Sequence, residues 1–211
     1  MTWSKNHPRQ RYHHGNLREA LINAALKLIG EKGPAGFTFA EAARSAGVSA
    51  AAPYRHFRDR DELMADVACR GFEQLAEGLE TAWSAGAPDA LAAFDRMGRA
   101  YLAFARAEPA YYAAMFESQV PPDASPELTK ASDAAFEVLR HAAEAVCALM
   151  PATARPPALM VALHVWSVAH GIASLFGRGD MARRKLPMEP EELLEAAVLV
   201  YLQGLGLGPD R

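Results

Sequence analysis

The sequence predicts an all-α fold of about nine helices, arranged as a three-helix helix-turn-helix domain followed by a larger helical domain. Apolar residues recur at helical intervals through most of the chain, and no stretch alternates as a strand does. Capping residues or prolines stand where the periodic stretches begin. With 211 residues and 51% hydrophobic content, the chain can bury a good core. We expect residues 1–60 to form the first domain and residues 61–211 the second.

The first predicted helix starts after Asn16, a favourable N-cap residue, and ends at Gly33-Pro34. Its apolar residues form one stripe along the helix: Leu17, Leu21, Ala24, Ala25, Leu28 and Ile29. We expect this stripe to support the two short helices that follow.

The stretch from Thr38 to Phe57 indicates a helix, a tight turn and a second helix. The Thr38 hydroxyl can cap the first helix while Glu41, three residues on, reaches back as in a capping box. Gly47 suits the left-handed residue that ends a helix. Ser49 is expected to cap the second helix. Pro53 should loosen its first turn, because proline lacks an amide hydrogen and crowds the preceding carbonyl.

The rest of the chain is expected to be helical, starting with a long helix over about 60–84 that contains no breaker at the domain border. The two domains should therefore be joined by continuous helix. Later helices are predicted over about 88–106, 109–118, 125–150, 157–176 and 190–204, separated by loops over 119–125 and 177–189.

Charge divides the chain unevenly. Residues 1–60 hold ten Lys and Arg against four Asp and Glu, a net of +6, whereas the remainder holds twelve against twenty-one, a net of −9. A basic end can displace counterions from a duplex, and an acidic body is repelled by it. This pattern favours a protein that docks end-on to double-stranded DNA.

Other classes of protein remain as alternatives. Capped short helices joined through glycine also occur in proteins that never bind DNA, so a helical protein-interaction or lipid-surface module with a basic end stays open. An enzyme is disfavoured because no catalytic constellation, metal site or cofactor motif is visible. Cys69 and Cys147 are interpreted as small core residues in a cytoplasmic protein, with the alternative that one of them senses an oxidant or a thiol-reactive ligand. The first sixteen residues show no apolar run of the kind a secretory signal needs.

From about Tyr12 to Leu63 the chain resembles the N-terminal domain of the TetR family of bacterial transcriptional regulators. The resemblance is densest in the stretches 46–49 (Ala-Gly-Val-Ser) and 54–63 (Tyr-Arg-His-Phe-Arg-Asp-Arg-Asp-Glu-Leu). A weaker one lies in residues 165–175, which are similar to a Trp-His-Gly helix in the C-terminal domain of one branch of the family. Together the two cover about a third of the chain.

The resemblance implies DNA-contacting residues. Thr38, Tyr54, His56 and Arg60 match positions that meet the phosphate backbone and set position rather than sequence. Base reading would fall to Ala50, Ala51, Ala52 and Arg55 after the Ser49 cap, with Ala40 beside them. Alanines can meet thymine methyls but cannot hydrogen-bond a base edge, so direct readout should be sparse. Arg9 and Arg11 could enter a minor groove from the N-terminal arm, or the arm could be a solvated terminus.

Residues 158–176 contain no Asp, Glu, Lys or Arg, and their length approaches that of a membrane span. We interpret them instead as a buried helix, because His164, Ser167, His170 and Ser174 suit hydrocarbon poorly. With the last helix they would form a four-helix homodimer interface, as the family does. A two-fold dimer would meet a palindromic operator with half-sites about 34 Å apart.

The middle helices are rich in aromatic and sulfur-containing side chains, most of which must be core. Collectively they fit an apolar cavity for a small apolar or aromatic effector, whose binding would change the spacing of the DNA-reading ends. Repression is the family's commoner mode. The candidate effector-binding residues are Tyr101, Phe104, Tyr112, Met115, Phe116, His141, His164, Trp166 and His170.

Overall fold

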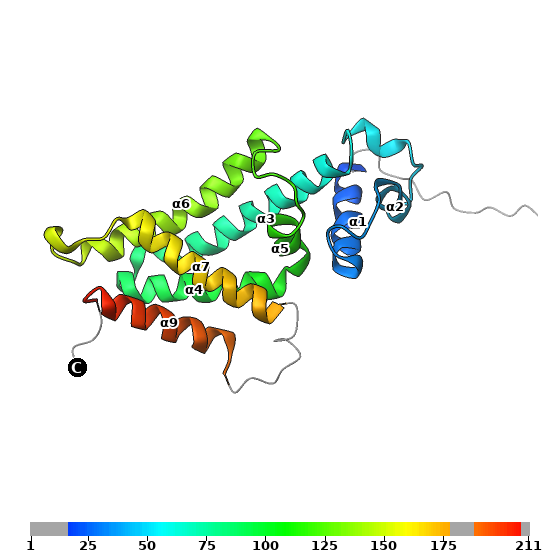
Figure 1. Ribbon diagram of the computed structural model, residues 1–211. Helices are drawn as coiled ribbons and strands as arrows, with labels where there is room; N and C mark the ends of the chain where they lie inside the picture. The colour runs from blue at the N-terminus through cyan, green and yellow to red at the C-terminus, as the bar shows by residue number, and fades with distance from the viewer. Residues whose placement is uncertain (1–16, 178–187, 208–211) are drawn as a thin grey trace, which may run out of the picture.

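The computed structural model describes residues 17–177 and 188–207, and within them it contains eight α-helices and no strand. The all-α prediction is therefore confirmed. Figure 1 shows a small helical end joined to a larger body by one long helix. The α-helices are α1 (Leu17–Lys32), α2 (Phe39–Ser45), α3 (Arg60–Trp83), α4 (Ala90–Ala107), α5 (Pro109–Phe116), α6 (Pro126–Ala148), α7 (Ala158–Gly177) and α9 (Pro190–Gly204).

Local capping chemistry sets where the helices begin. Thr38 forms the predicted capping box: its hydroxyl accepts from the Glu41 amide at 3.2 Å, and the Glu41 carboxylate accepts from the Thr38 amide at 2.8 Å. Asp59 and Ser125 cap α3 and α6 with their side-chain oxygens, which accept from the amides of Glu62 and Leu128. The predicted cap at Asn16 lies outside the described residues.

The second helix of the pair differs from the prediction. Gly47 takes the left-handed conformation as expected, with φ +72°. Ser49, however, caps no α-helix, because the segment that follows is only a four-residue 3-10 helix, Ala52–Arg55, without a side-chain cap. Pro53 explains the difference, since it removes an amide donor and crowds the preceding turn. Proline was expected to loosen only the first turn of the second helix, but the whole segment forms no α-helix.

The long helix α3 runs from the small helical end into the larger body, as the absence of a helix breaker at the domain border predicted. One apolar core joins α1, α2 and the first half of α3, and it also includes Ala113 and Ala114 of α5 and Leu128 of α6. A second core joins the rest of α3 to α4, α6, α7 and α9. The expected domain border at residue 60 falls on the first residue of α3, and it stays a prediction.

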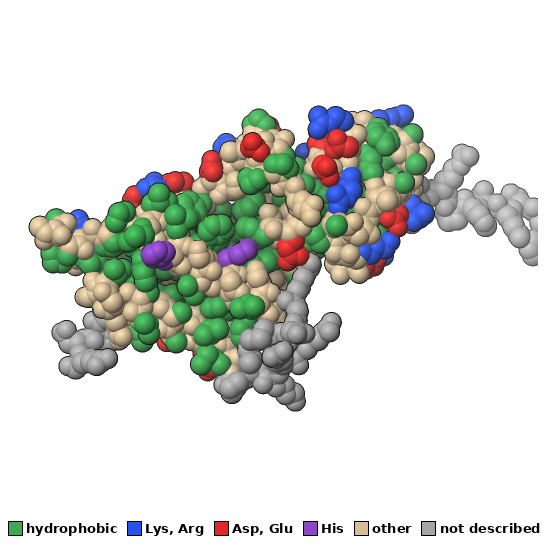
Figure 2. Space-filling model, in the orientation of Figure 1, with side chains coloured by type: hydrophobic (Ala, Val, Ile, Leu, Met, Phe, Trp, Pro, Cys, Tyr) green, Lys and Arg blue, Asp and Glu red, His purple; other side chains and the backbone are tan. Residues whose placement is uncertain are grey.

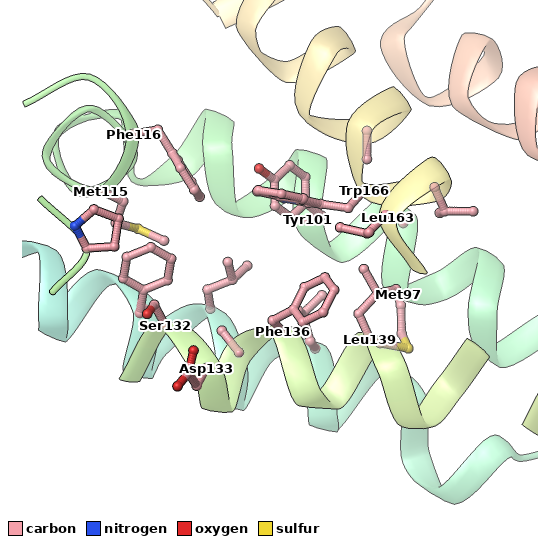
Figure 3. A pocket seen from close by; sticks show the side chains of 18 of the residues that line it. Met97, Tyr101, Met115, Phe116, Ser132, Asp133, Phe136, Leu139, Leu163 and Trp166 are labelled. Atoms are coloured by element: carbon pink, nitrogen blue, oxygen red, sulfur yellow. The ribbon is translucent and has the colours of Figure 1, made fainter. Parts of the chain in front are cut away.

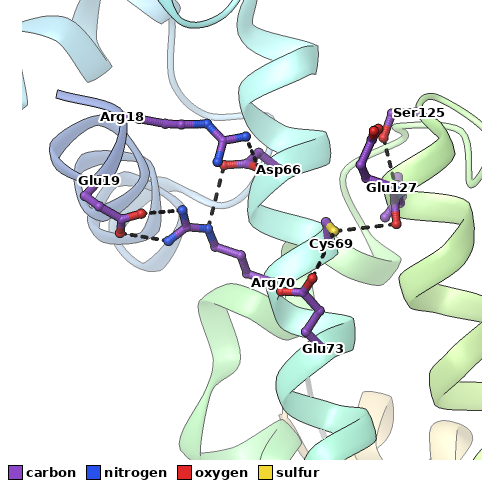
Figure 4. A network of polar contacts seen from close by, with 9 residues as sticks. Arg18, Glu19, Asp66, Cys69, Arg70, Glu73, Ser125 and Glu127 are labelled. Carbon is purple, nitrogen blue, oxygen red and sulfur yellow. Dashed lines mark hydrogen bonds and ion pairs between the residues drawn. The ribbon is translucent and has the colours of Figure 1, made fainter. Parts of the chain in front are cut away.

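Ion pairs fix α1 against α3 (Figure 4). Arg18 Nη2 lies 2.7 Å from Asp66 Oδ1, and Arg70 Nη1 donates to Glu19 Oε2 at 2.8 Å. Arg70 holds the pKa of Glu19 below its ordinary value, whereas burial raises the pKa of Asp66. Because two arginines and two carboxylates span the two helices, the orientation of α1 follows that of α3.

Candidate nucleic-acid interface and effector cavity

The small helical end presents a row of polar side chains to solvent. Tyr54 is 63% exposed, and its ring stands nearly perpendicular to that of Phe39 at a centroid distance of 5.1 Å. Arg55 and His56 are exposed beside it on the 3-10 segment. Within the described residues, none of the Tyr54, Arg55 and His56 side chains makes a hydrogen bond or ion pair. All three are therefore available to a phosphate or a base edge.

Lys and Arg gather over this end more densely than over the rest of the face in Figure 2. Most of them are already paired: Lys32 contacts Glu41 at 2.7 Å, and Arg58 contacts Asp59 at 3.0 Å. Within the described part of residues 1–60, Arg55 is the one Lys or Arg that has no ion pair. It is therefore the cation that DNA can engage without displacing a partner. Arg9 and Arg11, the candidate arm residues, lie outside the described residues.

The surface expected to read bases is apolar. Ala40, Ala50 and Ala51 are exposed, Ala52 is half-buried, and Ser49 is exposed beside them. A surface of methyl groups can contact thymine but cannot donate to or accept from a base edge.

Arg60 turns away from this surface. Its Nε donates to the Phe37 carbonyl at 3.0 Å, its Nη2 donates to the Pro34 carbonyl, and its guanidinium lies 4.9 Å from the centre of the Phe37 ring. The side chain is only 23% exposed. The structure thus gives Arg60 a role in holding the α1–α2 loop, and the phosphate contact implied by the resemblance stays a prediction.

The helical body contains a partly open cavity of about 420 Å³. Figure 3 shows Ser132, Phe136 and Leu139 of α6 on one side, and Tyr101, Leu163 and Trp166 on the other. Met115 and Phe116 of α5 close one end. Four of the residues expected to bind an effector therefore line one cavity: Tyr101, Met115, Phe116 and Trp166. Its volume and apolar wall are typical of a small-molecule site.

Two other candidates stand behind the wall and hold Tyr101 in place. His170 Nδ1 lies 2.8 Å from the Tyr101 hydroxyl and 3.0 Å from the Tyr112 hydroxyl, which also lies 3.1 Å from Ser174 Oγ. Burial lowers the pKa of His170 and raises that of Tyr101 well above its ordinary value. The imidazole is therefore neutral near pH 7 and can accept from a tyrosine.

The remaining candidates lie elsewhere. Phe104 is half-buried against the core, His141 is exposed on α6, and His164 is exposed on α7 with its Nδ1 3.0 Å from the Tyr201 hydroxyl. The structure brings none of these three to the cavity wall, and their effector contacts stay predictions.

Sequence reasoning missed Ser132 and Asp133, the polar residues at the start of the α6 side of the wall. A signal was present: Ser132, Phe136 and Leu139 follow each other at intervals of four and three residues, which places them on one helix face. The prediction was based on aromatic and sulfur-containing side chains, so it did not include the serine and the aspartate at this wall.

The two cysteines are free thiols. Cys147 is buried in the body, as expected for a small core residue. Cys69 is partly buried beside Glu73, and burial above all raises the pKa of its thiol to about 11. Both thiols are therefore protonated near neutral pH.

One helix of the described residues, α7, is long and apolar enough to cross a membrane by length and composition alone. It packs against α4, α6 and α9. The outer surface of α7 and α9 is nevertheless strongly apolar, with exposed side chains at Leu159, Val168, Leu175, Leu199 and Val200. Val200 is 68% exposed. Monomeric proteins rarely leave such a surface open to water.

Two family models match the chain. One, described as bacterial regulatory proteins of the tetR family, matches residues 21–67, and the other, described as a tetracyclin repressor-like C-terminal domain, matches residues 94–201. The finer likeness to a Trp-His-Gly branch stays a hypothesis.

Individual proteins agree with these matches. A solved structure of a protein with unknown function from Rhodococcus sp. RHA1 is 32% identical, covers 92% of this chain and 98% of its own, and has a TM-score of 0.76. The TetR family regulator PfmR from Thermus thermophilus shares the fold at 20% identity, with 90% and 99% coverage and a TM-score of 0.66. The HTH-type transcriptional regulator BetI of Rhizobium meliloti is 43% identical over 47 residues, 22% of this chain and 23% of that protein.

Proposed function

Since the chain belongs to the TetR family of bacterial transcriptional regulators, we propose that it binds a palindromic DNA operator as a homodimer, represses transcription, and is released by a small apolar or aromatic effector. Family and fold point to a regulator rather than to an enzyme. They also outweigh the alternative of an interaction or lipid-surface module, and the cytoplasm is the natural site of action.

The exposed row Tyr54, Arg55 and His56 carries the proposal for DNA binding. These side chains lie on one short segment at the basic end, and none is engaged by another described residue. Tyr54 and His56 would donate to phosphates, and Arg55 would meet a base edge or a phosphate. Because Ala50 and Ala51 offer only methyl groups, operator choice would rest on Arg55 and on DNA shape.

The apolar outer surface of α7 and α9 supports the homodimer. Leu159, Leu175 and Val200 are all more than half exposed in the single chain, and a second copy related by a two-fold axis would cover them. A dimer of this kind would hold two reading ends at a fixed separation, as a palindromic operator requires.

The cavity supports effector release. Phe72 of α3 lines it, two residues from the Arg70 that is paired with Glu19 of α1. An effector that binds two tilts of α3 with different affinities would therefore bias the position of the reading end.

Operator binding is tested by recovering genomic fragments with the purified protein and measuring affinity for the recovered site by fluorescence anisotropy across a salt series. We expect a twofold-symmetric site and a log–log salt slope of several units. Arg55→Ala should weaken binding about tenfold, equivalent to ~1.4 kcal/mol. The matched control is Lys130→Ala on α6, which also removes an exposed cation that pairs with no described carboxylate and should leave affinity unchanged. Equal, salt-insensitive binding to symmetric and random duplexes would contradict the proposal.

A further inference from the structure

The wall of the cavity carries a single formal charge. Among the described residues that line it, Asp133 is the only Asp, Glu, Lys, Arg or His. Its carboxylate makes no ion pair and no hydrogen bond with the other described residues, and it is exposed on α6 next to Ser132. In Figure 3 it lies on the α6 side of the cavity, towards the end that Met115 closes. The carboxylate is therefore free to pair with a ligand.

Aromatic rings make up much of the remaining wall. Six of the described lining residues are aromatic: Phe72, Phe94, Tyr101, Phe116, Phe136 and Trp166. Trp166 meets Phe136 edge-on with ring centres 6.2 Å apart, and its centre lies 6.5 Å from that of Phe116. Ring faces carry negative electrostatic potential, which attracts a cation and repels an anion.

No Lys or Arg is among the described residues that line the cavity, and two arginines of the helices that form its wall already have partners. Arg140 on α6 is held by Glu137 and Glu144, and Arg96 on α4 donates to the carbonyls of Ala82 and Ala87. A carboxylate or phosphate that entered the cavity would lose its hydration and find no opposite charge in the described wall. A neutral ligand would gain from apolar burial but would leave Asp133 unused.

We propose that the effector of this cavity is an amphipathic organic cation, whose ammonium group pairs with Asp133 while its apolar part lies among the aromatic rings. The inference rests on the proposed function, because it names the chemical class of the ligand at the same site. It distinguishes this chain from a sensor of fatty acids or of other organic anions.

The test uses three probes with the same apolar chain and different heads: decyltrimethylammonium, 1-decanol and decanoate, each below its micelle concentration. Binding to the full chain is followed by calorimetry and by the fluorescence of tryptophan, one of which lines the cavity. We expect the ammonium probe to bind at least tenfold more tightly than decanoate. Raising the salt concentration should narrow this gap, because the carboxylate is exposed and screened.

Variants assign the preference to one side chain. Asp133→Asn should weaken the ammonium probe by about threefold to tenfold and leave 1-decanol unchanged, while Asp133→Glu should retain most of the preference. Asp123→Asn is the matched control, since Asp123 is an exposed carboxylate on the preceding loop and does not line the cavity. It should behave as the parent does. An exposed surface position is not expected to affect folding, and thermal melts of each variant would check this.

Three results would each overturn the inference. Decanoate could bind as tightly as the ammonium probe, the preference for the ammonium probe could survive in Asp133→Asn, or no probe could bind. Operator affinity of the unliganded parent is measured in parallel. If it is intact, only the ligand class is wrong. If it is absent, the proposed function itself fails, whatever the probes do.

Discussion

Arg60 offers the sharpest test of whether a residue implied to contact DNA instead maintains the fold. Its guanidinium donates to two backbone carbonyls, those of Pro34 and Phe37, and lies over the Phe37 ring. We predict that Arg60→Met destabilises the protein and that Arg60→Lys restores only part of the loss. A lysine keeps the charge but cannot reach two carbonyls in a fixed fork.

The magnitude follows from these contacts. A hydrogen bond from a charged donor contributes roughly 1.5–3 kcal/mol, and a cation over an aromatic ring roughly 0.5–1 kcal/mol at an accessible site. Because the Arg60 side chain is partly exposed, the lower end of each range applies to the two hydrogen bonds and the ring contact, which gives about 3.5 kcal/mol for Arg60→Met. For a chain of this length, that loss lowers the melting temperature by about 7–14 °C.

Thermal unfolding followed by circular dichroism measures the first effect, and the salt dependence of operator binding measures the second. A residue that only contacts phosphate would leave the melting temperature unchanged, reduce the salt slope by about 0.9 when removed, and be rescued by lysine. That combination would refute the structural role. Arg58→Met is the control, because Arg58 is strongly exposed beside Asp59 and should not alter the melting temperature.

Three further predictions concern pH, the cavity and the dimer. Hydrogen bonds from Lys32 and then from Thr38 lower the pKa of Glu41 from 4.5 to about 2. The ionised Glu41 carboxylate therefore stabilises the fold fully above about pH 4.5, and this stabilisation is lost as the pH falls towards 2. The melting temperatures of parent and Glu41→Gln should therefore differ near neutral pH and converge in acid. Gly71→Ala would place a Cβ 2.6 Å from Met115 Sδ. Met115 must then move at the cavity wall, which should weaken probe binding several-fold, while a helix-propensity gain of about 1 kcal/mol offsets most of the crowding. Val200→Glu, on an exposed apolar surface, should yield folded monomers in sedimentation.

Each of the three has a control. Glu31→Gln, which removes an exposed carboxylate of α1, is the control for the loss of a glutamate elsewhere on the small end. Gly78→Ala lies on the same helix with nothing within 4 Å of its Cβ and should leave probe affinity unchanged. Thr81→Glu, exposed on α3, should leave the dimer intact. The pH argument fails if the melting temperatures of parent and Glu41→Gln differ by the same amount at every pH. The cavity argument fails if Gly71→Ala binds the probes as the parent does. The dimer argument fails if Val200→Glu sediments as a dimer at the concentration at which the parent does.

Local features were readable from the chain alone. The capping box of Thr38 and Glu41, the left-handed Gly47 and the prolines that open α5, α6 and α9 involve residues within a few positions of each other. So does the loosening by Pro53, although its extent was underestimated. Helix periodicity is equally local, and it correctly predicted that α3 would cross from the small end into the body.

The tertiary structure decided which distant residues each side chain contacts. Arg60 bonds carbonyls more than twenty positions away, and Tyr101 meets His170 across a separation of 69 positions. The sequence determined which helices form, which faces are apolar and which end is basic, because these follow from near neighbours and composition. Only the packing of helices decided that Asp133 would border the cavity and that Arg60 would turn inward, because that depends on the register between elements distant in the chain.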